Sequence, residues 1–218
     1  MRTQAIRFRE NPNLELIAFH GHFATRHSHN SHYLDITRLK HEYSLAHDTA
    51  LALANHYIYE KSIDTIICMD GSEVIGAFLA RQLTQKILFS VNNNKSICVV
   101  TPEYDSNGQL IFRDNLTGMV SGKNVLLLIS TVNSGKTARR AMECIEYYGG
   151  SLQGIAAVFS AIAKVDEVPV MSIFSPEDIP GYMTSLVPDC PLCRAGQKID
   201  ALANSYGFSI LKCNDNMK

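Results

Sequence analysis

The segment from residue 123 to residue 150 constrains the fold more than any other part of the chain. It begins with an unbroken apolar run of buried-strand length, Val125–Ile129, and continues through a loop of small and polar residues, Ser130–Thr137. Ala138–Tyr148 then carries apolar residues at helical spacing and ends at Gly149-Gly150. The pattern predicts a strand, a loop and a helix in succession. Such a unit brings free backbone N–H groups and a helix N-terminus to one point, which favours phosphate or another anion.

The tripeptide Gly135-Lys136-Thr137 is also found in nucleotide-binding P-loops, but a P-loop needs a glycine five positions before Gly135, where this chain has Ser130. The segment instead resembles the signature of the type I phosphoribosyltransferases. In that family an apolar strand runs into two acidic residues, and a short loop ending in a small–Gly–x–Thr step follows. The resemblance implies a binding site for the 5′-phosphate of phosphoribosyl pyrophosphate formed by Val132, Asn133, Ser134, Gly135, Lys136 and Thr137.

Ser130 and Thr131 depart from this signature, because they occupy the positions of the two acidic residues. The family associates that acidic pair with the ribose hydroxyls of the donor. Hydrogen bonds to a charged group contribute about 1.5–3 kcal/mol each, against about 1 kcal/mol for neutral ones, so the exchange costs roughly 1–4 kcal/mol. Two interpretations stay open: both hydroxyls bind the ribose and take part in catalysis, or Ser130 ends a strand and Thr131 forms a turn.

Strand-like and helix-like stretches alternate along the rest of the chain. This alternation predicts a mostly parallel sheet with helices on both faces, in which ligands bind at the carboxyl ends of the strands. The predicted helices are Glu42–Tyr59 and Ser72–Lys86, and the further predicted strands are Asp64–Met69, Ser96–Thr101, Gly154–Phe159 and Val170–Phe174.

The predicted strand-to-helix loop after Cys68 strengthens the resemblance. Gly71 and Ser72 suit a tight turn and a helix N-cap. In type I phosphoribosyltransferases the equivalent loop contacts the pyrophosphate of the donor, which here implies Met69, Asp70, Gly71 and Ser72. Asp70 would repel a diphosphate unless a metal ion lay between them. A plain turn or cap residue is the competing interpretation of Asp70.

The loop after Thr101 predicts a hairpin, since Asn107-Gly108 stands between short apolar stretches. The family carries a mobile antiparallel flap at this position, which closes over the active site. The basic run of the orotate enzymes is missing from this flap, and Arg113 is its available cation. The resemblance therefore assigns Arg113, with Ser130 and Thr131, to the catalytic residues.

All eight histidines fall between His20 and His56, and five of them lie within His20–His32. His20 and His22, or His27 and His29, would share one side of a strand, as metal ligands can. The spacing matches no known zinc pattern, so we assign no metal ligand among the histidines from sequence.

Cys190 and Cys193 form the one close cysteine pair, Cys-Pro-Leu-Cys. Such a pair is half of a zinc knuckle or a redox pair, and no second pair accompanies it. A structural zinc at Cys190/Cys193 and a plain structural loop both stay open, with the loop favoured. Similar segments occur near the C-terminus of some orotate phosphoribosyltransferase-like proteins.

Composition restricts the class of protein further. A net charge of −1 with 19% charged residues indicates no basic surface for nucleic acid. No apolar stretch approaches the roughly 20 residues of a membrane span. Six cysteines with only one close pair indicate reduced thiols in a cytoplasmic protein.

These features and the resemblance predict a single α/β domain over residues 1–218, with a small hood from residues 1–40 and 176–218 that covers the base. Tyr33-Leu34-Asp35 would begin the first core helix. The expected reaction transfers ribose 5-phosphate from phosphoribosyl pyrophosphate to a base, with Mg²⁺ assistance and an orotate-type pyrimidine favoured, in a homodimer. A non-catalytic phosphoribosyl or nucleotide sensor on the same fold is the alternative, and the sequence does not name the base.

Overall fold

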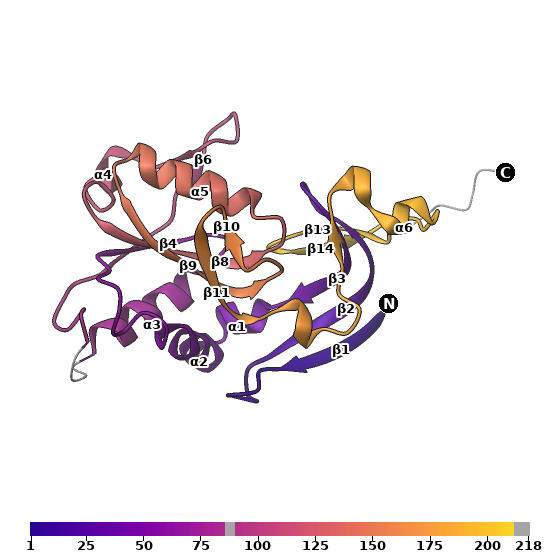
Figure 1. Ribbon diagram of the computed structural model, residues 1–218, viewed down its shortest axis with the longest axis horizontal. Coiled ribbons are helices and arrows are strands. Elements are labelled where there is room, and N and C mark those ends of the chain that lie inside the picture. Colours follow the sequence, from indigo (N-terminus) through magenta and orange to yellow (C-terminus); the bar gives the residue numbers. More distant parts are fainter. Residues whose placement is uncertain (86–89, 212–218) are drawn as a thin grey trace.

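The centre of the protein is a six-stranded sheet in which five neighbouring strands are parallel (Figure 1). The computed structural model describes residues 1–85 and 90–211. The short strand at one edge runs antiparallel to its neighbour. Across the sheet the order is β10 (Lys164–Val165), β11 (Val168–Phe174), β9 (Ser151–Ser160), β8 (Asn124–Val132), β4 (Thr65–Cys68) and β5 (Cys98–Val100).

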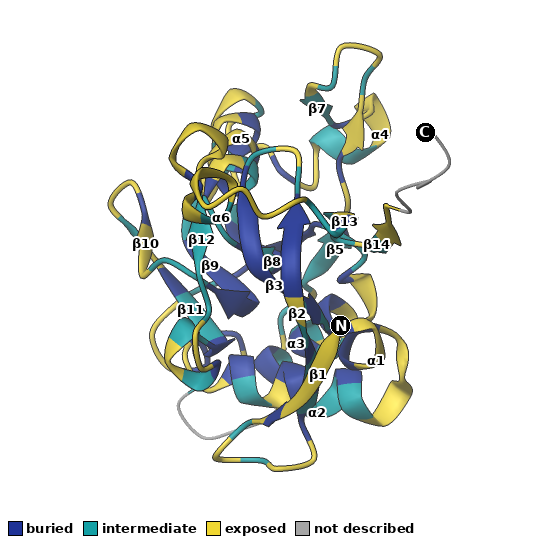
Figure 2. Cartoon of the chain, turned by 90° about the vertical axis from the view of Figure 1, so that its right-hand side faces the viewer, coloured by how far each residue is buried: buried dark blue, intermediate teal, exposed yellow. Residues whose placement is uncertain are grey.

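Helices cover both faces of this central sheet, and the side chains of β8 divide between the two faces. Leu126 and Leu128 pack in one core with α2 and α3, while Leu127 and Ile129 pack in the other with α5. Successive residues of a strand point to opposite faces, so an unbroken apolar run suits a strand buried on both sides. β8 is buried at every position except Asn124 and Thr131, and Figure 2 shows the burial of the described residues in colour. The helices near this sheet are α1 (Thr37–His41), α2 (Tyr43–Ala54), α3 (Glu73–Thr84) and α5 (Lys136–Tyr147).

A second sheet, here called the hood sheet, joins strands from both ends of the chain and lies beside the central sheet (Figure 1). β2 is its longest strand: its first part pairs with β1 and its end pairs with β13. Antiparallel β3 pairs with β2 along the other side, with a bulge between His20 and Phe23. The strands are β1 (Arg2–Arg7), β2 (Glu15–Ala24), β3 (His29–Asp35), β12 (Thr184–Ser185), β13 (Ala201–Asn204) and β14 (Gly207–Ile210).

Short elements complete the fold. The predicted hairpin is present, with its turn closed by the Asp105 carboxylate, which accepts the N–H groups of Asn107 and Gln109 at 2.8 Å each. The remaining elements are β6 (Glu103–Tyr104), β7 (Leu110–Ile111), α4 (Asp114–Thr117), the 3₁₀ turns η1 (Pro176–Asp178) and η2 (Val187–Asp189), and α6 (Pro191–Arg194). Within the described residues no helix is both long and apolar enough to cross a membrane.

The α/β fold class is confirmed, and so are the predicted strands and helices, with corrections at their ends. The helix predicted over Glu42–Tyr59 ends at Ala54, where the chain turns so that the hydroxyl of buried Tyr57 donates to the Ile155 carbonyl at 3.0 Å. Tyr33-Leu34-Asp35 ends β3, and the first helix begins at Thr37. Lys86, at the end of a predicted helix, and residues 212–218 of the predicted hood lie outside the described residues.

The end of β8 was also predicted too early. Ser130 and Thr131 belong to the strand rather than to the loop, because β8 stays paired with β9 through Thr131 opposite Phe159 and Val132 opposite Ser160. The loop that follows is therefore only three residues long before α5 begins at Lys136.

Candidate functional site

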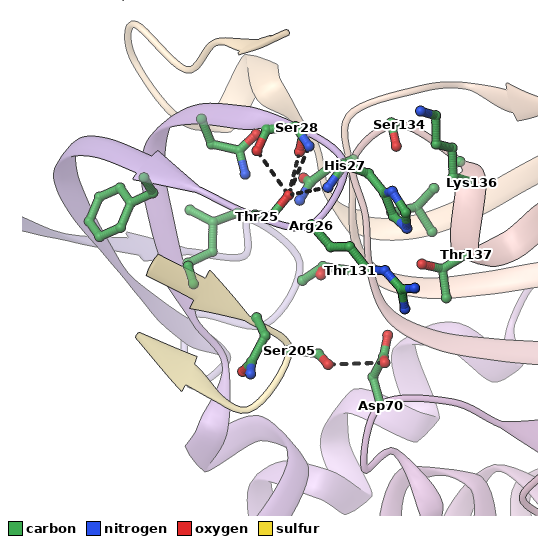
Figure 3. Close-up of a pocket in the computed structure, with 18 of the residues that line it drawn as sticks. Thr25, Arg26, His27, Ser28, Asp70, Thr131, Ser134, Lys136, Thr137 and Ser205 are labelled. Atoms are coloured by element: carbon green, nitrogen blue, oxygen red, sulfur yellow. Dashed lines mark hydrogen bonds between the residues drawn. The ribbon is translucent and has the colours of Figure 1, made fainter. Parts of the chain in front are cut away.

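A cavity of about 240 Å³ lies where the central sheet meets the hood sheet. One side comes from the carboxyl ends of β4 and β8, where ligands of α/β folds bind. The opposite side comes from the turn between β2 and β3 and from the turn between β13 and β14. Figure 3 shows Thr25, Arg26 and His27 of the first turn facing Thr131, Lys136 and Thr137 across this space.

The loop between β8 and α5 presents unpaired backbone donors to the cavity. Gly135 caps α5 with a φ of 74°, in the left-handed region, and a Cβ here would stand 3.0 Å from Cδ1 of Ile162. In the described part of the chain, the N–H groups of Ser134, Gly135, Lys136 and Thr137 donate no hydrogen bond to another residue. The N-terminus of a 12-residue helix adds a partial positive charge at the same point. Free N–H groups at a helix N-terminus are the arrangement that binds anions in other proteins.

A buried tyrosine holds this loop in place. The hydroxyl of Tyr182 donates to Oδ1 of Asn133 at 2.7 Å. Burial raises the pKa of Tyr182, so the phenol stays protonated and remains a donor. The loop is thus anchored from the segment that leads into the hood sheet, which couples the two parts of the cavity wall.

Three cations line the cavity: Arg26 from the β2–β3 turn, and Lys136 and Arg140 from the first turns of α5. No carboxylate of the described residues lies within ion-pair distance of any of them. His27 lies among them. Burial lowers the pKa of His27, and the positive charges of Arg140, Lys136 and Arg26 lower it further. The cavity is therefore electropositive on this side.

Asp70 supplies the negative charge at the other end of the cavity. Its φ is 60°, an uncommon conformation for a residue other than glycine. Its carboxylate accepts the Ser205 hydroxyl at 3.0 Å, the dashed line in Figure 3. Burial raises the pKa of Asp70, while the Ser205 hydrogen bond and the charge of Lys40 oppose that shift. Non-glycine residues held in such a conformation cluster at functional sites.

Lys40 of α1 fixes the position of this carboxylate. It is only 2% exposed, and its Nζ donates to the backbone carbonyls of Asp70 and Ser205 at 2.9 Å each. Burial lowers the pKa of Lys40, and the charges of Asp70 and Glu73 act to raise it. One buried ammonium group thus joins the loop after β4 to the β13–β14 turn of the hood sheet.

The structure separates the two residues that stand in place of the family's acidic pair. Thr131 lines the cavity. Ser130 is fully buried, does not line the cavity, and donates its hydroxyl to the Asp70 carbonyl at 3.0 Å. Alternation along β8 explains the difference, because neighbouring side chains of a strand point to opposite faces.

The other predicted site residues also divide into those that line the cavity and those that do not. Of the loop after β4, Asp70 reaches the cavity, while Met69 and Ser72 are buried beneath it, with the Ser72 hydroxyl donating to the Met69 carbonyl at 2.8 Å. Gly71 has a φ of 73° and completes the turn. Arg113 does not line the cavity; it forms two hydrogen bonds, of 3.0 and 2.9 Å, with the carboxylate of Glu103 across the flap.

Sequence reasoning missed Arg26, Lys40, Arg140 and Ser205. The position of Arg140 could have indicated that it lies beside the loop. It follows Thr137 by three residues on the predicted helix, and residues three apart lie on the same face of a helix. Arg26 lay within the histidine-rich segment and was passed over for its neighbours. Lys40 and Ser205 meet Asp70 only through tertiary structure.

The histidines and the cysteine pair come together outside this cavity. Among the described residues, one group has the composition and spacing of a metal site: His22, His29, Cys190 and Cys193. The predicted pairing of histidines along a strand is replaced by pairing across strands, since His22 meets His29 and His20 meets His32 between antiparallel β2 and β3.

No protein-family model matches the chain. In sequence, the chain is 27% identical over 183 residues to the orotate phosphoribosyltransferase of Thermus thermophilus, which covers 83% of this chain and 91% of that one. The similarity thus extends over most of both chains.

Solved structures show the same fold. The orotate phosphoribosyltransferase of Mycobacterium tuberculosis superposes with a TM-score of 0.50 at 14% identity, over 69% of this chain and 83% of that one. A phosphoribosyltransferase from Corynebacterium diphtheriae gives 0.50 at 16% identity, over 74% and 90%. The UMP synthase of Leishmania donovani gives 0.52 at 14% identity, over 70% of this chain and 32% of that longer one. The chain thus has the fold of the type I phosphoribosyltransferases and resembles the orotate phosphoribosyltransferases in sequence.

Proposed function

We propose that the protein transfers ribose 5-phosphate from phosphoribosyl pyrophosphate to a ring nitrogen of a nucleobase and releases pyrophosphate. The observation that carries this proposal is the meeting, in one cavity, of the four free N–H groups of Ser134–Thr137 with three cations that have no carboxylate partner. The donor is anionic at both ends, with a 5′-phosphate and a diphosphate. An orotate-type pyrimidine is the favoured acceptor, in line with the activity named for the Thermus relative.

The free N–H groups at one end of the cavity and Asp70 at the other support one placement of the donor. Its 5′-phosphate binds the N–H groups of Ser134–Thr137 at the N-terminus of α5. Its ribose then lies against the Thr131 hydroxyl, and its diphosphate extends towards the loop Met69–Ser72, of which Asp70 faces the cavity. Arg26 and Arg140 stand beside this path and neutralise phosphate charge.

Asp70 would hold a Mg²⁺ ion that accompanies the donor. Such an ion keeps several waters and is bound through one or two carboxylates together with substrate phosphates. Asp70 is the carboxylate among the residues that line the cavity. Its position after β4 would let it serve as the one protein ligand of the ion. The ion would shield the diphosphate from Asp70 and stabilise the charge that develops on pyrophosphate. Lys40 and Ser205 hold Asp70 for this role.

The reaction exchanges one bond at C1′ of the ribose. The C1′–O bond to the diphosphate breaks, its electron pair leaves with pyrophosphate, and the base nitrogen forms the new C1′–N bond and releases its proton. The transition state resembles an oxocarbenium ion, so catalysis rests on positioning and on stabilising the leaving group. Arg26 and Arg140, which stand beside the path of the diphosphate, would supply that stabilisation, and Lys136 would bind the 5′-phosphate. Buried Ser130 acts by holding the backbone of the Asp70 loop. Arg113 stays a predicted catalytic residue, and it would have to break its hydrogen bonds with Glu103 to reach the cavity.

Loss of the acidic pair favours a second candidate, a phosphoribosyl or nucleotide sensor that binds without turnover. Thr131 offers one neutral hydroxyl where the family has two carboxylates. The catalytic function is preferred, since a single missing pair costs roughly 1–4 kcal/mol, or about one to three decades in rate, rather than all activity. Incubation with donor, Mg²⁺ and a panel of bases, followed by pyrophosphate detection, separates the two candidates: product supports the enzyme, and donor binding without product supports the sensor.

Two neighbouring arginines of α5 provide a matched test of the donor site. Arg140 faces the cavity, while Arg139 is held outside by Asp166 at 3.1 and 2.6 Å. Arg140→Gln should weaken donor binding by about ten- to 150-fold, the equivalent of one charge-assisted hydrogen bond of about 1.5–3 kcal/mol. Arg139→Gln should leave it unchanged, because an exposed ion pair contributes little. Equal effects of the two variants would contradict the assignment of the cavity.

A homodimer, a cytoplasmic location and the division into a domain over 1–218 with hood segments 1–40 and 176–218 stay predictions. Sedimentation of the purified chain would test the dimer.

A further inference from the structure

The four residues that meet outside the cavity converge on a single point. Nε2 of His22 lies 3.1 Å from Nδ1 of His29, and the Sγ atoms of Cys190 and Cys193 lie 3.5 and 3.7 Å from the same Nε2. Cys193 Sγ also lies 3.2 Å from Nδ1 of His29. All four candidate ligand atoms are within 4.8 Å of one another.

Four of these six separations are close to the edges of a zinc tetrahedron. Zn–S bonds of about 2.3 Å and Zn–N bonds of about 2.0–2.1 Å at tetrahedral angles place ligand atoms about 3.3–3.8 Å apart. Those four separations, each of which involves Nε2 of His22 or Nδ1 of His29, span 3.1 to 3.7 Å. Two thiolates and two imidazoles are also a known ligand set for structural zinc.

The imidazole of His22 is oriented as a metal ligand. Its Nδ1 lies 3.0 Å from the Gln197 carbonyl and donates to it, which leaves Nε2 unprotonated and directed at the other three residues. Metal-binding histidines commonly donate their second ring nitrogen to a backbone carbonyl in this way. The backbone of His22 is fixed too, because its N–H donates to the Asp200 carboxylate at 2.7 Å.

The cysteine segment lacks the apolar burial that would otherwise hold it in place. Neither η2 nor α6 contains a buried residue, and Leu186 and Val187 are 44% and 48% exposed. Cys190 is the exception at 1% exposure, and it is buried against the histidines rather than in either hydrophobic core. A short irregular segment with so little core needs another source of stability, and metal ligation supplies one.

We propose that His22, His29, Cys190 and Cys193 bind one structural Zn²⁺ that fastens the C-terminal segment to the β2–β3 hairpin. Four protein ligands leave no open position for a substrate, which is the arrangement of structural rather than catalytic zinc. The ion would tie residues 186–200 to the two strands that flank the Thr25–Ser28 turn. Since that turn lines the cavity, the zinc would also shape the cavity wall that faces the loop between β8 and α5. This site is independent of the proposed transfer reaction.

The first test is the metal content of the full-length chain, purified without a metal-affinity step and analysed by elemental mass spectrometry. About one zinc per chain is expected, together with the visible spectrum of a tetrahedral thiolate site when Co²⁺ replaces the zinc. Less than about one tenth of an equivalent, with no uptake of Zn²⁺ or Co²⁺ by the reduced apoprotein, would overturn the proposal. A Cys190–Cys193 disulfide in the chain as isolated, before any reductant is added and with air excluded, would overturn it as well.

Matched variants test the ligand set. Cys193→Ser should weaken zinc binding by more than about 100-fold in chelator competition, beyond the effect of a change around the ligands. Cys98→Ser, which changes a cysteine in β5, should bind zinc as the wild type does. His29→Gln should lose zinc, while His32→Gln, on the same strand, should keep it. Equal affinities within either pair would contradict the assignment. If a ligand variant fails to fold, a zinc-dependent rise in the Tm of the wild-type apoprotein decides instead, and an unchanged Tm refutes the proposal.

Discussion

Replacing Gly135 by alanine tests whether the left-handed cap of α5 shapes the loop between β8 and α5. The backbone there has a φ of 74°, and an alanine in that conformation costs about 1–2 kcal/mol. The new Cβ would stand 3.0 Å from Cδ1 of Ile162 and 3.3 Å from Cγ2 of Val165. Both contacts are ends of side chains that can give way, so crowding adds about 1 kcal/mol, at the low end for overpacking. The sum is about 2–3 kcal/mol of lost stability.

That loss should appear as a fall in Tm of about 4–12 °C for a chain of this size, measured by calorimetry. If the loop relaxes instead to relieve the strain, the N–H groups of Ser134–Thr137 lose their alignment and donor binding weakens. The control is Gly118→Ala, where φ is −66° and no atom lies within 4 Å of the added Cβ, so stability should change by less than about 0.5 kcal/mol. Unchanged stability and unchanged donor affinity in Gly135→Ala would refute the role given to this glycine.

Three further predictions concern the cavity. Thr131→Asp should raise turnover without loss of stability. Ser130→Asp should lower Tm markedly, because it buries a carboxylate. Higher turnover in Ser130→Asp but not in Thr131→Asp would contradict the placement of Thr131, rather than Ser130, beside the ribose. Tyr182→Phe should cost about 1 kcal/mol and weaken donor binding through Asn133, and an unchanged donor affinity would count against that anchor. Asp70→Asn should raise Tm at neutral pH yet weaken binding of the Mg²⁺–donor complex, as checked by thermal melts and titration.

The pH dependence of the Asp70 variant follows from the direction of its pKa shift. Because the folded protein raises the pKa of Asp70, ionising this carboxyl costs stability, and the cost grows as pH rises from about 3.8 towards the folded pKa. The Tm advantage of Asp70→Asn should therefore be small in acid and reach its full size above the folded pKa. An advantage that grew as pH fell would contradict the burial of this carboxylate.

The sequence was sufficient for the central sheet and for the loop between β8 and α5 because both depend on local pattern. An apolar run such as Val125–Ile129 has few alternatives to a buried strand, and Gly135 followed by a periodic helix marks the cap. The ends of β8 and α2 were misplaced, since pairing with β9 and packing of Tyr57 are tertiary effects. The histidine pairs were misassigned for a similar reason: their partners lie across the hairpin, not along one strand.

The rest of the site could not be read from spacing. Lys40, Asp70 and Ser205 are far apart in sequence and meet only where α1, the end of β4 and the hood sheet come together. The burial of Ser130 and the exposure of Thr131 to the cavity depend on where the strand ends. The cluster of His22, His29, Cys190 and Cys193 likewise joins residues more than 160 positions apart.

The most direct test of the central claim is a calorimetric titration of the protein with phosphoribosyl pyrophosphate, with and without Mg²⁺. The electropositive cavity and the free N–H groups of Ser134–Thr137 predict binding in the micromolar range that strengthens when Mg²⁺ is present. The Thr137→Ala variant should lose most of this affinity. No heat at millimolar donor under either condition would contradict the account, because an anion site of this construction could not then be a site for the donor.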